Sequence, residues 1–167
     1  MAYRNKTYIC FDGDEDMHYY RLITAWKARD GKEFNFHNAH DLYPMQKGKL
    51  VANDEAYIKK KLHQRFLNTK CLLVLVGQKT KNLYRYVRWE IDVALQLDIP
   101  IVVVNLNKKN GIDYTLCPSI LKKELAIHIP YSRDAIVIGI DNWPDSHKIH
   151  RKQQETGPYR YPDLNPS

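Results

Sequence analysis

One carboxylate in this sequence stands where a helix is expected to be apolar. Residues Lys81–Asp98 have the periodicity of an amphipathic helix, and Glu90 falls inside its apolar arc, away from Arg88 and Asp92. An ionised carboxylate loses hydration there, so it either keeps its proton to higher pH or meets a partner that compensates its charge. Such carboxylates concentrate at functional sites, but structural ion pairs produce them too. Glu90 is therefore either a functional acid or a structural residue that reaches water or pairs with an arginine.

Other polar residues directly follow the segments that are expected to form strands. In an open parallel sheet the ligand lies outside the carboxyl ends of the strands, so these residues are candidates for a site. Glu90 lies about two turns into the helix after the third strand, so its side chain can face the same carboxyl edge of the sheet, called the rim below. The candidates are Asp12, Gly13, Asp14, Glu15 and Asp16 after the first strand, His37, Asn38, His40 and Asp41 after the second, and Gly77, Gln78, Lys79 and Thr80 after the third.

Each of these candidates also has a simple structural interpretation. The acidic run Asp12–Asp16 is typical of a turn that leads into a helix, where acids stabilise the positive helix end. Residues 37–50 are either a surface loop or a lid over a substrate, and Gly77 is expected to permit the turn after its strand. The pattern alone leaves both interpretations open.

The order of the segments predicts the fold class. Strands that are apolar throughout and separated by helices indicate a parallel sheet covered on both faces. The alternation and the right-handed crossover rule predict a flavodoxin-like α/β fold with five parallel strands in the order 2-1-3-4-5. Ser132 is expected to cap the last helix, and Pro144 to restart or kink it. The expected strands are residues 7–11, 33–37, 71–76, 100–105 and 126–129, and the expected helices are residues 17–29, 53–68, 81–98, 119–124 and 132–142.

The length of 167 residues predicts one domain with a substantial core. Residues 1–153 are expected to form this domain, and the proline-containing segment 154–167, which has no periodicity, is expected to be a loose or surface-hugging tail. No apolar run approaches the ~18 residues that span a bilayer, and the N-terminal stretch lacks a signal-peptide core.

The three cysteines do not indicate a disulfide framework. Cys10 and Cys71 lie within apolar runs and Cys117 precedes a proline, which fits a reducing cytoplasm. No cysteine and histidine have zinc-ligand spacing, so no metal site is expected. The net charge of +7 is spread along the chain, and Lys59–Lys61 occupy the solvent side of a helix. Such a diffuse field attracts an anionic dinucleotide or another acidic partner, and nucleic-acid binding is not expected from it.

Several common site types lack their motifs here. The sequence contains no GxxxxGK[ST] phosphate loop and no GxGxxG fingerprint, which argues against ordinary nucleotide hydrolysis and hydride transfer. It has no GxSxG nucleophile elbow. A phosphoacceptor receiver domain would need an aspartate at the end of the third strand, where this chain has Gly77.

Several segments together resemble a known family. Phe11-Asp12 at the end of the first strand, the loop His37–Met45, the strand CLLVLVG and above all the helix segment Tyr86–Ile91 (YVRWEI) resemble the TIR-like domains of bacterial antiphage systems. The similarity is greatest to the TIR-like, NAD+-consuming signal synthase of Thoeris defence. It covers roughly residues 6–143, including the stretch CPSILKKELAIHIP.

The resemblance implies a specific activity. TIR enzymes cleave the nicotinamide–ribose bond of NAD+ with a glutamate on the helix after the third strand, and Glu90 matches that position. Loss of nicotinamide leaves an oxocarbenium-like ribose, which a nearby carboxylate can stabilise. NAD+ is then the substrate, with no separate cofactor. The ADP-ribose is cyclised or joined to another acceptor, which yields a nucleotide signal for a separate effector protein.

The resemblance also implies where the substrate binds. Phe11 and Asp12 are expected to contact the nicotinamide half, and residues 37–41 to form a lid. Because the turn after the first strand is acidic, the diphosphate is expected near Lys79, Thr80 or Arg88. The complete set of predicted substrate-binding residues is Phe11, Asp12, His37, Asn38, Asp41, Gly77, Lys79, Thr80 and Tyr86.

A TIR-like interaction module without catalysis is the alternative. It would keep the fold and assemble with copies of itself through its basic surface and residues 37–50. The enzymatic interpretation also expects self-association, but only the enzyme would act on its effector through a diffusible product.

Overall fold

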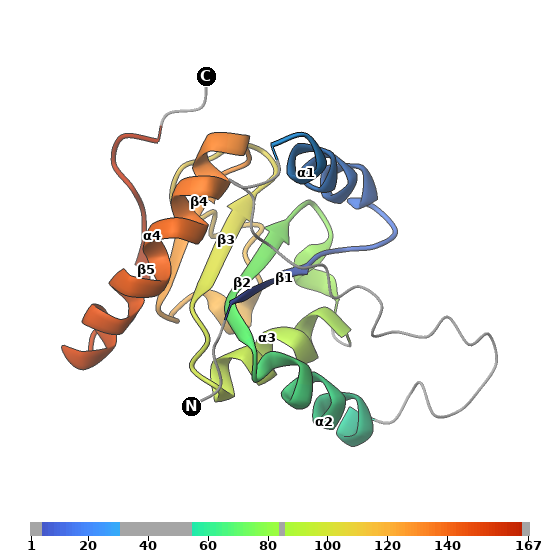
Figure 1. Ribbon diagram of the computed structural model, residues 1–167, viewed down its shortest axis with the longest axis vertical. Coiled ribbons are helices and arrows are strands. Elements are labelled where there is room, and N and C mark those ends of the chain that lie inside the picture. The colour runs from blue at the N-terminus through green and yellow to red at the C-terminus, as the bar shows by residue number, and fades with distance from the viewer. Residues whose placement is uncertain (1–4, 31–54, 84–85, 165–167) are drawn as a thin grey trace.

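The computed structural model describes residues 5–30, 55–83 and 86–164 and shows one parallel sheet with helices on both faces (Figure 1). The strands are β1 (Lys6–Cys10), β2 (Thr69–Val76), β3 (Ile101–Asn105), β4 (Ala126–Pro130) and β5 (Pro158–Tyr159); the α-helices are α1 (Met17–Asp30), α2 (Glu55–Phe66), α3 (Tyr86–Gln96) and α4 (Arg133–Lys152), with short 3-10 helices η3 (Thr80–Asn82) and η4 (Ser119–Leu121). The sheet order is β1-β2-β3-β4-β5, with every pair parallel. This confirms the α/β class and the five-stranded parallel sheet.

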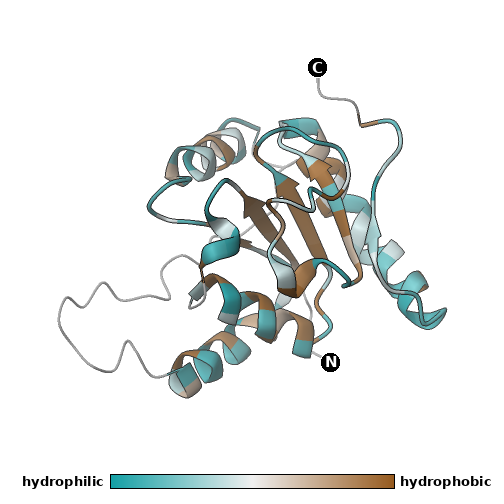
Figure 2. Cartoon of the chain, turned by 180° about the vertical axis from the view of Figure 1, so that it is seen from behind, coloured by the Kyte–Doolittle hydropathy of each residue, from teal (hydrophilic) through white to brown (hydrophobic). Residues whose placement is uncertain are grey.

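The central strands are apolar on both faces, which explains their unbroken hydrophobic runs. Leu72 and Val74 of β2 enter the core beneath α2 and α3, whereas Leu73 and Leu75 enter the core beneath α1 and α4. Figure 2 shows hydrophobic strands inside and hydrophilic outer helix faces. Side chains within the sheet therefore pack in the core, and the polar residues that could bind a ligand lie at the ends of the strands.

The predicted strand order 2-1-3-4-5 is not confirmed. The strand expected at residues 33–37 lies outside the described residues, and the other four expected strands are β1, β2, β3 and β4, adjacent in that order. The fifth strand of the described sheet is β5, which lies in the expected tail and pairs with β4. A two-residue strand is too short to produce a periodic pattern, so the sequence does not reveal it.

Helix α4 runs further than predicted, because Pro144 lies inside it without ending it. Proline removes the N–H that would bond to the carbonyl of Ile140. However, Trp143, Pro144 and His147 are all buried, so this part of α4 is held by packing. The ring of Trp143 lies 5.9 Å, centroid to centroid, from that of Tyr159 in β5. The extra length of α4 therefore also packs against the additional strand.

Other helix signals agree with the structure. Ser132 caps α4, as predicted, because its Oγ accepts a hydrogen bond from the N–H of Ala135 at 3.1 Å. Helix α2 buries Ile58, Leu62 and Phe66, one turn apart on a single face. Among the described residues, none of the helices combines the length and the hydrophobicity needed to cross a membrane.

At the carboxyl edge of the sheet, Gly77 lies directly against the carboxylate of Asp16. A Cβ atom added to Gly77 would lie 2.4 Å from Asp16 Oδ2. The φ of Gly77 is not positive, so a left-handed backbone does not explain this glycine; a side chain there would instead force the carboxylate of Asp16 to shift. Asp16 is 6% exposed, and its Oδ2 has no hydrogen-bond partner among the described residues. Burial, followed by the charge of Asp12, raises the pKa of Asp16.

Strand β4 carries a histidine in the interior. His128 is completely buried, and neither ring nitrogen has a hydrogen-bond partner in the described part of the chain. Ala126 belongs to the core beneath α3, so strand alternation places His128 on the same face. Burial lowers the pKa of His128 to about 4, which leaves the imidazole neutral at pH 7.

Replacing Gly77 with alanine should destabilise the fold, because the new methyl group collides with a buried carboxylate. We expect a loss of about 1–3 kcal/mol in the free energy of unfolding, measured by urea denaturation. Gly13→Ala is the matched control, since a Cβ there meets nothing within 4 Å, and its effect should stay within ~0.5 kcal/mol. In an Asp16→Ala background the cost of Gly77→Ala should largely disappear, and an undiminished cost would contradict this explanation.

His128 should make the protein sensitive to mild acid. The folded pKa, about 4, lies below the unfolded value of about 6.5, so the unfolded chain binds more protons and stability falls as pH drops between these values. At pH 5 this residue should cost about 2 kcal/mol of unfolding free energy relative to pH 7. Urea denaturation of His128→Leu at both pH values should show a smaller difference than the wild type. His18→Gln, at an exposed position on α1, should keep the wild-type difference; an equal pH difference in all three proteins would refute the explanation.

Candidate functional site

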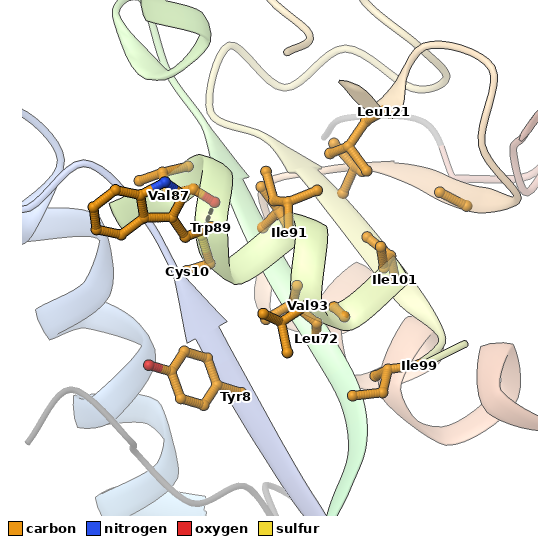
Figure 3. Close-up of a cluster of buried hydrophobic side chains, with 14 of the residues drawn as sticks. Tyr8, Cys10, Leu72, Val87, Trp89, Ile91, Val93, Ile99, Ile101 and Leu121 are labelled. Atoms are coloured by element: carbon orange, nitrogen blue, oxygen red, sulfur yellow. Dashed lines mark hydrogen bonds between the residues drawn. The ribbon is translucent and has the colours of Figure 1, made fainter. Parts of the chain in front are cut away.

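Glu90 lies within the buried face of α3, where the periodicity predicts it. It is 5% exposed, and its neighbours Trp89 and Ile91 are buried as well. Arg88, by contrast, is exposed. The same face of α3 belongs to the core that includes β1 and β2 (Figure 3). The helix thus holds a carboxylate in an otherwise apolar layer.

Contacts on α3 set the direction in which Glu90 points. On the outer side of the helix, Nζ of Lys59 in α2 lies 2.7 Å from Oδ2 of Asp92. In the first turn, the rings of Tyr86 and Trp89 meet edge to face, with centroids 5.4 Å apart. Because the polar side is held by α2 and the apolar side by the core, Glu90 is kept facing inwards.

The last residue of β1 contacts the first turns of α3. Cys10 is 1% exposed, and its Sγ lies 3.9 Å from the carbonyl oxygen of Val87 (Figure 3). Glu90, three residues further along α3, lies near enough for its charge to act on the Cys10 thiol. Burial, followed by the negative charge of Glu90, raises the pKa of Cys10 well above its ordinary value, so the thiol keeps its proton and acts as a donor. This proximity places Glu90 at the carboxyl end of β1, the edge where ligands bind in such sheets.

Phe11 and Asp12, the predicted nicotinamide contacts, are both buried just after β1. The ring of Phe11 stacks on Tyr20 of α1, with centroids 4.7 Å apart, and belongs to the core on the sheet face opposite α3. Oδ1 of Asp12 accepts hydrogen bonds from the N–H groups of Asp14 and Glu15 at 3.0 and 3.3 Å. These bonds build the turn that the acidic run predicts. A contact of either residue with substrate stays a prediction.

Thr80 organises the turn after β2. Its Oγ1 accepts a hydrogen bond from the N–H of Gly77 at 2.9 Å and donates one to the carbonyl of Leu75 at 3.4 Å. Thr80 is buried, whereas Lys79 is exposed and its Nζ lies 2.7 Å from Oε1 of Glu15. This ion pair joins the turns after β1 and β2. Of the two predicted phosphate ligands in this turn, Thr80 therefore supports the turn and Lys79 presents its charge at the rim.

The remaining predicted residues divide into two groups. Tyr86 opens α3 one turn before Glu90 and lies on the same side of the helix. His37, Asn38 and Asp41 lie outside the described residues, so their role as a lid is untested.

Sequence reasoning missed Cys10 and the contact between Asp16 and Gly77. Cys10 sits in an apolar run, where a cysteine is normally a small core residue. One signal was present: Cys10 lies next to the end of the expected strand 7–11, whose carboxyl end is already a candidate for the site. Asp16 was treated as part of a helix start, and no spacing rule connects it to a glycine after another strand.

A separate cavity lies next to the amino-terminal ends of β2 and β3, the end of the sheet opposite this rim. It has a volume of about 540 Å³, and its lining includes Lys148 and Lys152 of α4. Asp98 and Asp145 line it too, and the carboxyl end of α3 adds negative partial charge. Asp98 is itself paired with Arg151, whose Nη2 lies 2.9 Å from its Oδ1. This mixed charge favours no particular ligand.

The rim around Glu90, in contrast, suits a positively charged centre. A carboxylate that is poorly hydrated attracts a cation more strongly than one in bulk water. The site can therefore stabilise positive charge that develops on a ligand at the end of β1.

Comparison with protein families gives one informative result. Residues 8–111 match the family described as "Thoeris protein ThsB, TIR-like domain". This range covers more than half of the chain and includes most of β1, the rim turns, Glu90 and β3. Among proteins with curated functions, none matches the sequence. From the length of the family match, the chain belongs to the TIR-like domain family of the Thoeris protein ThsB.

Proposed function

We propose that this protein cleaves the nicotinamide–ribose bond of NAD+ and turns the ADP-ribose part into a nucleotide signal of antiphage defence. The observation that supports the proposal most strongly is the placement of Glu90. Its side chain is buried in an apolar layer of α3, and the last residue of β1, Cys10, contacts the same helix at Val87. Burying a carboxylate is costly, and such groups concentrate at functional sites, which supports a functional role for Glu90.

The bond to be broken explains why one carboxylate can be enough. The nicotinamide ring of NAD+ is a cation, so it departs with the bonding electron pair as a neutral molecule and needs no general acid. The positive charge passes to the ribose, which becomes oxocarbenium-like at its anomeric carbon. Glu90 stabilises this charge, and a nucleophile from the same ADP-ribose or from another acceptor then forms the new bond to that carbon.

The charges at the rim support one orientation of NAD+ in the proposed site. Asp12 and Asp16 are unfavourable neighbours for a diphosphate, and Lys79 and Arg88 are the exposed cations near the turn after β2 and on α3. The proposal therefore places the diphosphate towards Lys79 and Arg88, with the nicotinamide ribose next to Glu90. Because Lys79 is held by Glu15 in the free protein, binding would exchange this partner for a phosphate.

A non-catalytic TIR-like interaction module is the competing proposal. Exposed apolar side chains on and after α2, Tyr57 at 41% and Leu67 at 46% exposure, are consistent with contacts between copies. Both proposals keep the fold, so activity at Glu90 separates them.

Self-association is part of both proposals, and it should be visible in solution. Light scattering at rising protein concentration, with and without NAD+, should show species larger than one chain. A strict monomer throughout would contradict assembly. The signalling half is tested separately: product purified from the reaction should activate an effector encoded next to this protein, and an inert product would contradict it.

Replacing Glu90 with glutamine should abolish NAD+ cleavage and leave the fold intact. Glutamine keeps the shape of the side chain but removes the charge that stabilises the ribose cation. We expect nicotinamide release to fall by about 10²-fold or more. The thermal midpoint should be unchanged or higher, because an amide is less costly to bury than a carboxylate. Release should be measured with purified protein and in extracts of phage-infected cells.

Asp92→Asn is the matched control, because it makes the same chemical change on the outer side of the same helix. It breaks the pair with Lys59, so it should cost ~1 kcal/mol or less and leave turnover unchanged. If Glu90→Gln is less stable but fully active per folded molecule, Glu90 is structural and the catalytic proposal fails. Wild-type protein that releases no nicotinamide in either setting would favour the interaction module.

A further inference from the structure

The outer face of α2 carries positive charge that no acid in the described part of the chain neutralises. Its exposed cations are Lys60, Lys61 and Arg65, called the α2 basic face below. Lys59 differs from them, because Glu55 and Asp92 hold its Nζ at 2.9 and 2.7 Å. The ring of Tyr57 is 41% exposed and lies under Lys61, whose Nζ is 4.8 Å from the ring centroid. The α2 basic face therefore adjoins an exposed aromatic surface.

The outer face of α4 carries the opposite charge. Its exposed acids are Asp134, Asp141 and Asp145, called the α4 acidic face below. Asp141 follows Asp134 by two helical turns and precedes Asp145 by one, so the three carboxylates lie along one line of the helix. Asp134 is paired with Arg133 at 3.0 Å, whereas the other two have no ion-pair partner among the described residues. Ile138, 37% exposed, lies beside this line.

The two charged faces lie on opposite sides of the molecule. Helix α2 packs with α3 on one face of the sheet, and α4 packs with α1 on the other (Figure 1). One chain therefore cannot pair these charges within itself, and two copies cannot form both contacts with each other at once. A contact between the α2 basic face of one copy and the α4 acidic face of the next leaves one face of each kind open, which is the geometry of a head-to-tail assembly.

We propose that the α2 basic face and the α4 acidic face are the two halves of one contact, through which copies of this chain stack head to tail. This inference deepens the self-association in the proposed function and rests on it. The net charge of +7 opposes association, so local complementarity must drive it. A nucleic acid would fit the α2 basic face but would leave the α4 acidic face unexplained, whereas a second copy accounts for both. Tyr57 and Ile138 give the two faces the apolar surface that ion pairs alone lack.

The experiment reverses each face separately. The α2-reversed variant carries Lys60→Glu with Lys61→Glu, and the α4-reversed variant carries Asp141→Lys with Asp145→Lys. Wild-type mass in light scattering should keep rising with concentration and not stop at a dimer. Each variant has two faces of the same sign, so each should need at least about tenfold more protein to assemble. All four positions are exposed, and thermal midpoints should stay close to the wild type.

Mixing the two variants is the decisive step. In an equimolar mixture the acidic α2 of one variant meets the basic α4 of the other, and the unaltered faces still fit each other. The mixture should therefore assemble at the wild-type concentration. A chain with all four substitutions should also assemble, because it regains both the complementary faces and the original net charge. Added salt should disperse all of these assemblies, because ions screen pairs at exposed positions.

Lys108→Glu with Lys109→Glu is the matched control. These adjacent lysines are exposed in the loop after β3, and their reversal changes the net charge as much as the α2-reversed variant does. This control should assemble at least as readily as the wild type. Reversed variants that assemble like the wild type, or a mixture that stays dispersed, would overturn the proposal. Assembly that only the α2-reversed variant loses, and that nuclease disperses in the wild type, would assign the α2 basic face to nucleic acid instead.

Nicotinamide release, measured on the same samples, separates this inference from the proposed catalysis. Wild-type protein that assembles and responds to charge reversal, but releases no nicotinamide in purified form or in infected-cell extracts, would refute the catalytic proposal and keep the contact. A wild-type protein that remains a strict monomer while it releases nicotinamide would refute the contact and keep the catalytic proposal.

Discussion

Burial of the sheet on both faces is the constraint that shapes this protein. Every residue of β3 is inaccessible to water, and nearly all of β2 is as well, so a polar side chain there must find a partner within the protein or remain unsatisfied. The strand ends escape this limit, because the chain leaves the sheet and meets solvent. The turns that carry Asp12, Gly77 and Lys79 lie at one such end. Glu90 combines the two situations, because its side chain is buried and yet lies towards the carboxyl end of the sheet.

The buried polar side chains of the described residues differ in how their need for hydrogen-bond partners is met. Asn105, at the end of β3, is satisfied by its own loop, since its Nδ2 donates to the carbonyls of Lys109 and Gly111 at 2.9 and 2.7 Å. His128 remains neutral instead of finding a partner. Glu90 is buried near the thiol of Cys10, whose pKa is raised by burial and then by the charge of Glu90.

Features that depend on local periodicity could be predicted from the sequence, whereas features that depend on contacts between distant segments could not. The inward position of Glu90 depends on helix periodicity, a local property, and it was predictable. The family, and with it the proposed chemistry, was predictable from the segment around Glu90 and the strand before it. The contact of Cys10 with α3 joins two elements far apart in the chain, and the close approach of Asp16 to Gly77 joins the turns after two different strands. Likewise, β5 exists because α4 continues through Pro144 and packs against it, which depends on tertiary contacts that no local pattern records.

The pairing of β1 with β2 has a consequence for how the chain is made. Cys10 pairs with Val74, so the first strand to leave the ribosome has its partner only after a long stretch of further synthesis. Non-local parallel pairing of this kind also slows folding, because the entropy of closing a long loop is lost before the contact stabilises the chain. Glu90 emerges later still, on the helix that follows β2. A chain that ends before β2 and α3 therefore cannot assemble the carboxyl edge that carries Gly77 and Glu90, so this edge forms only after both segments have been synthesised.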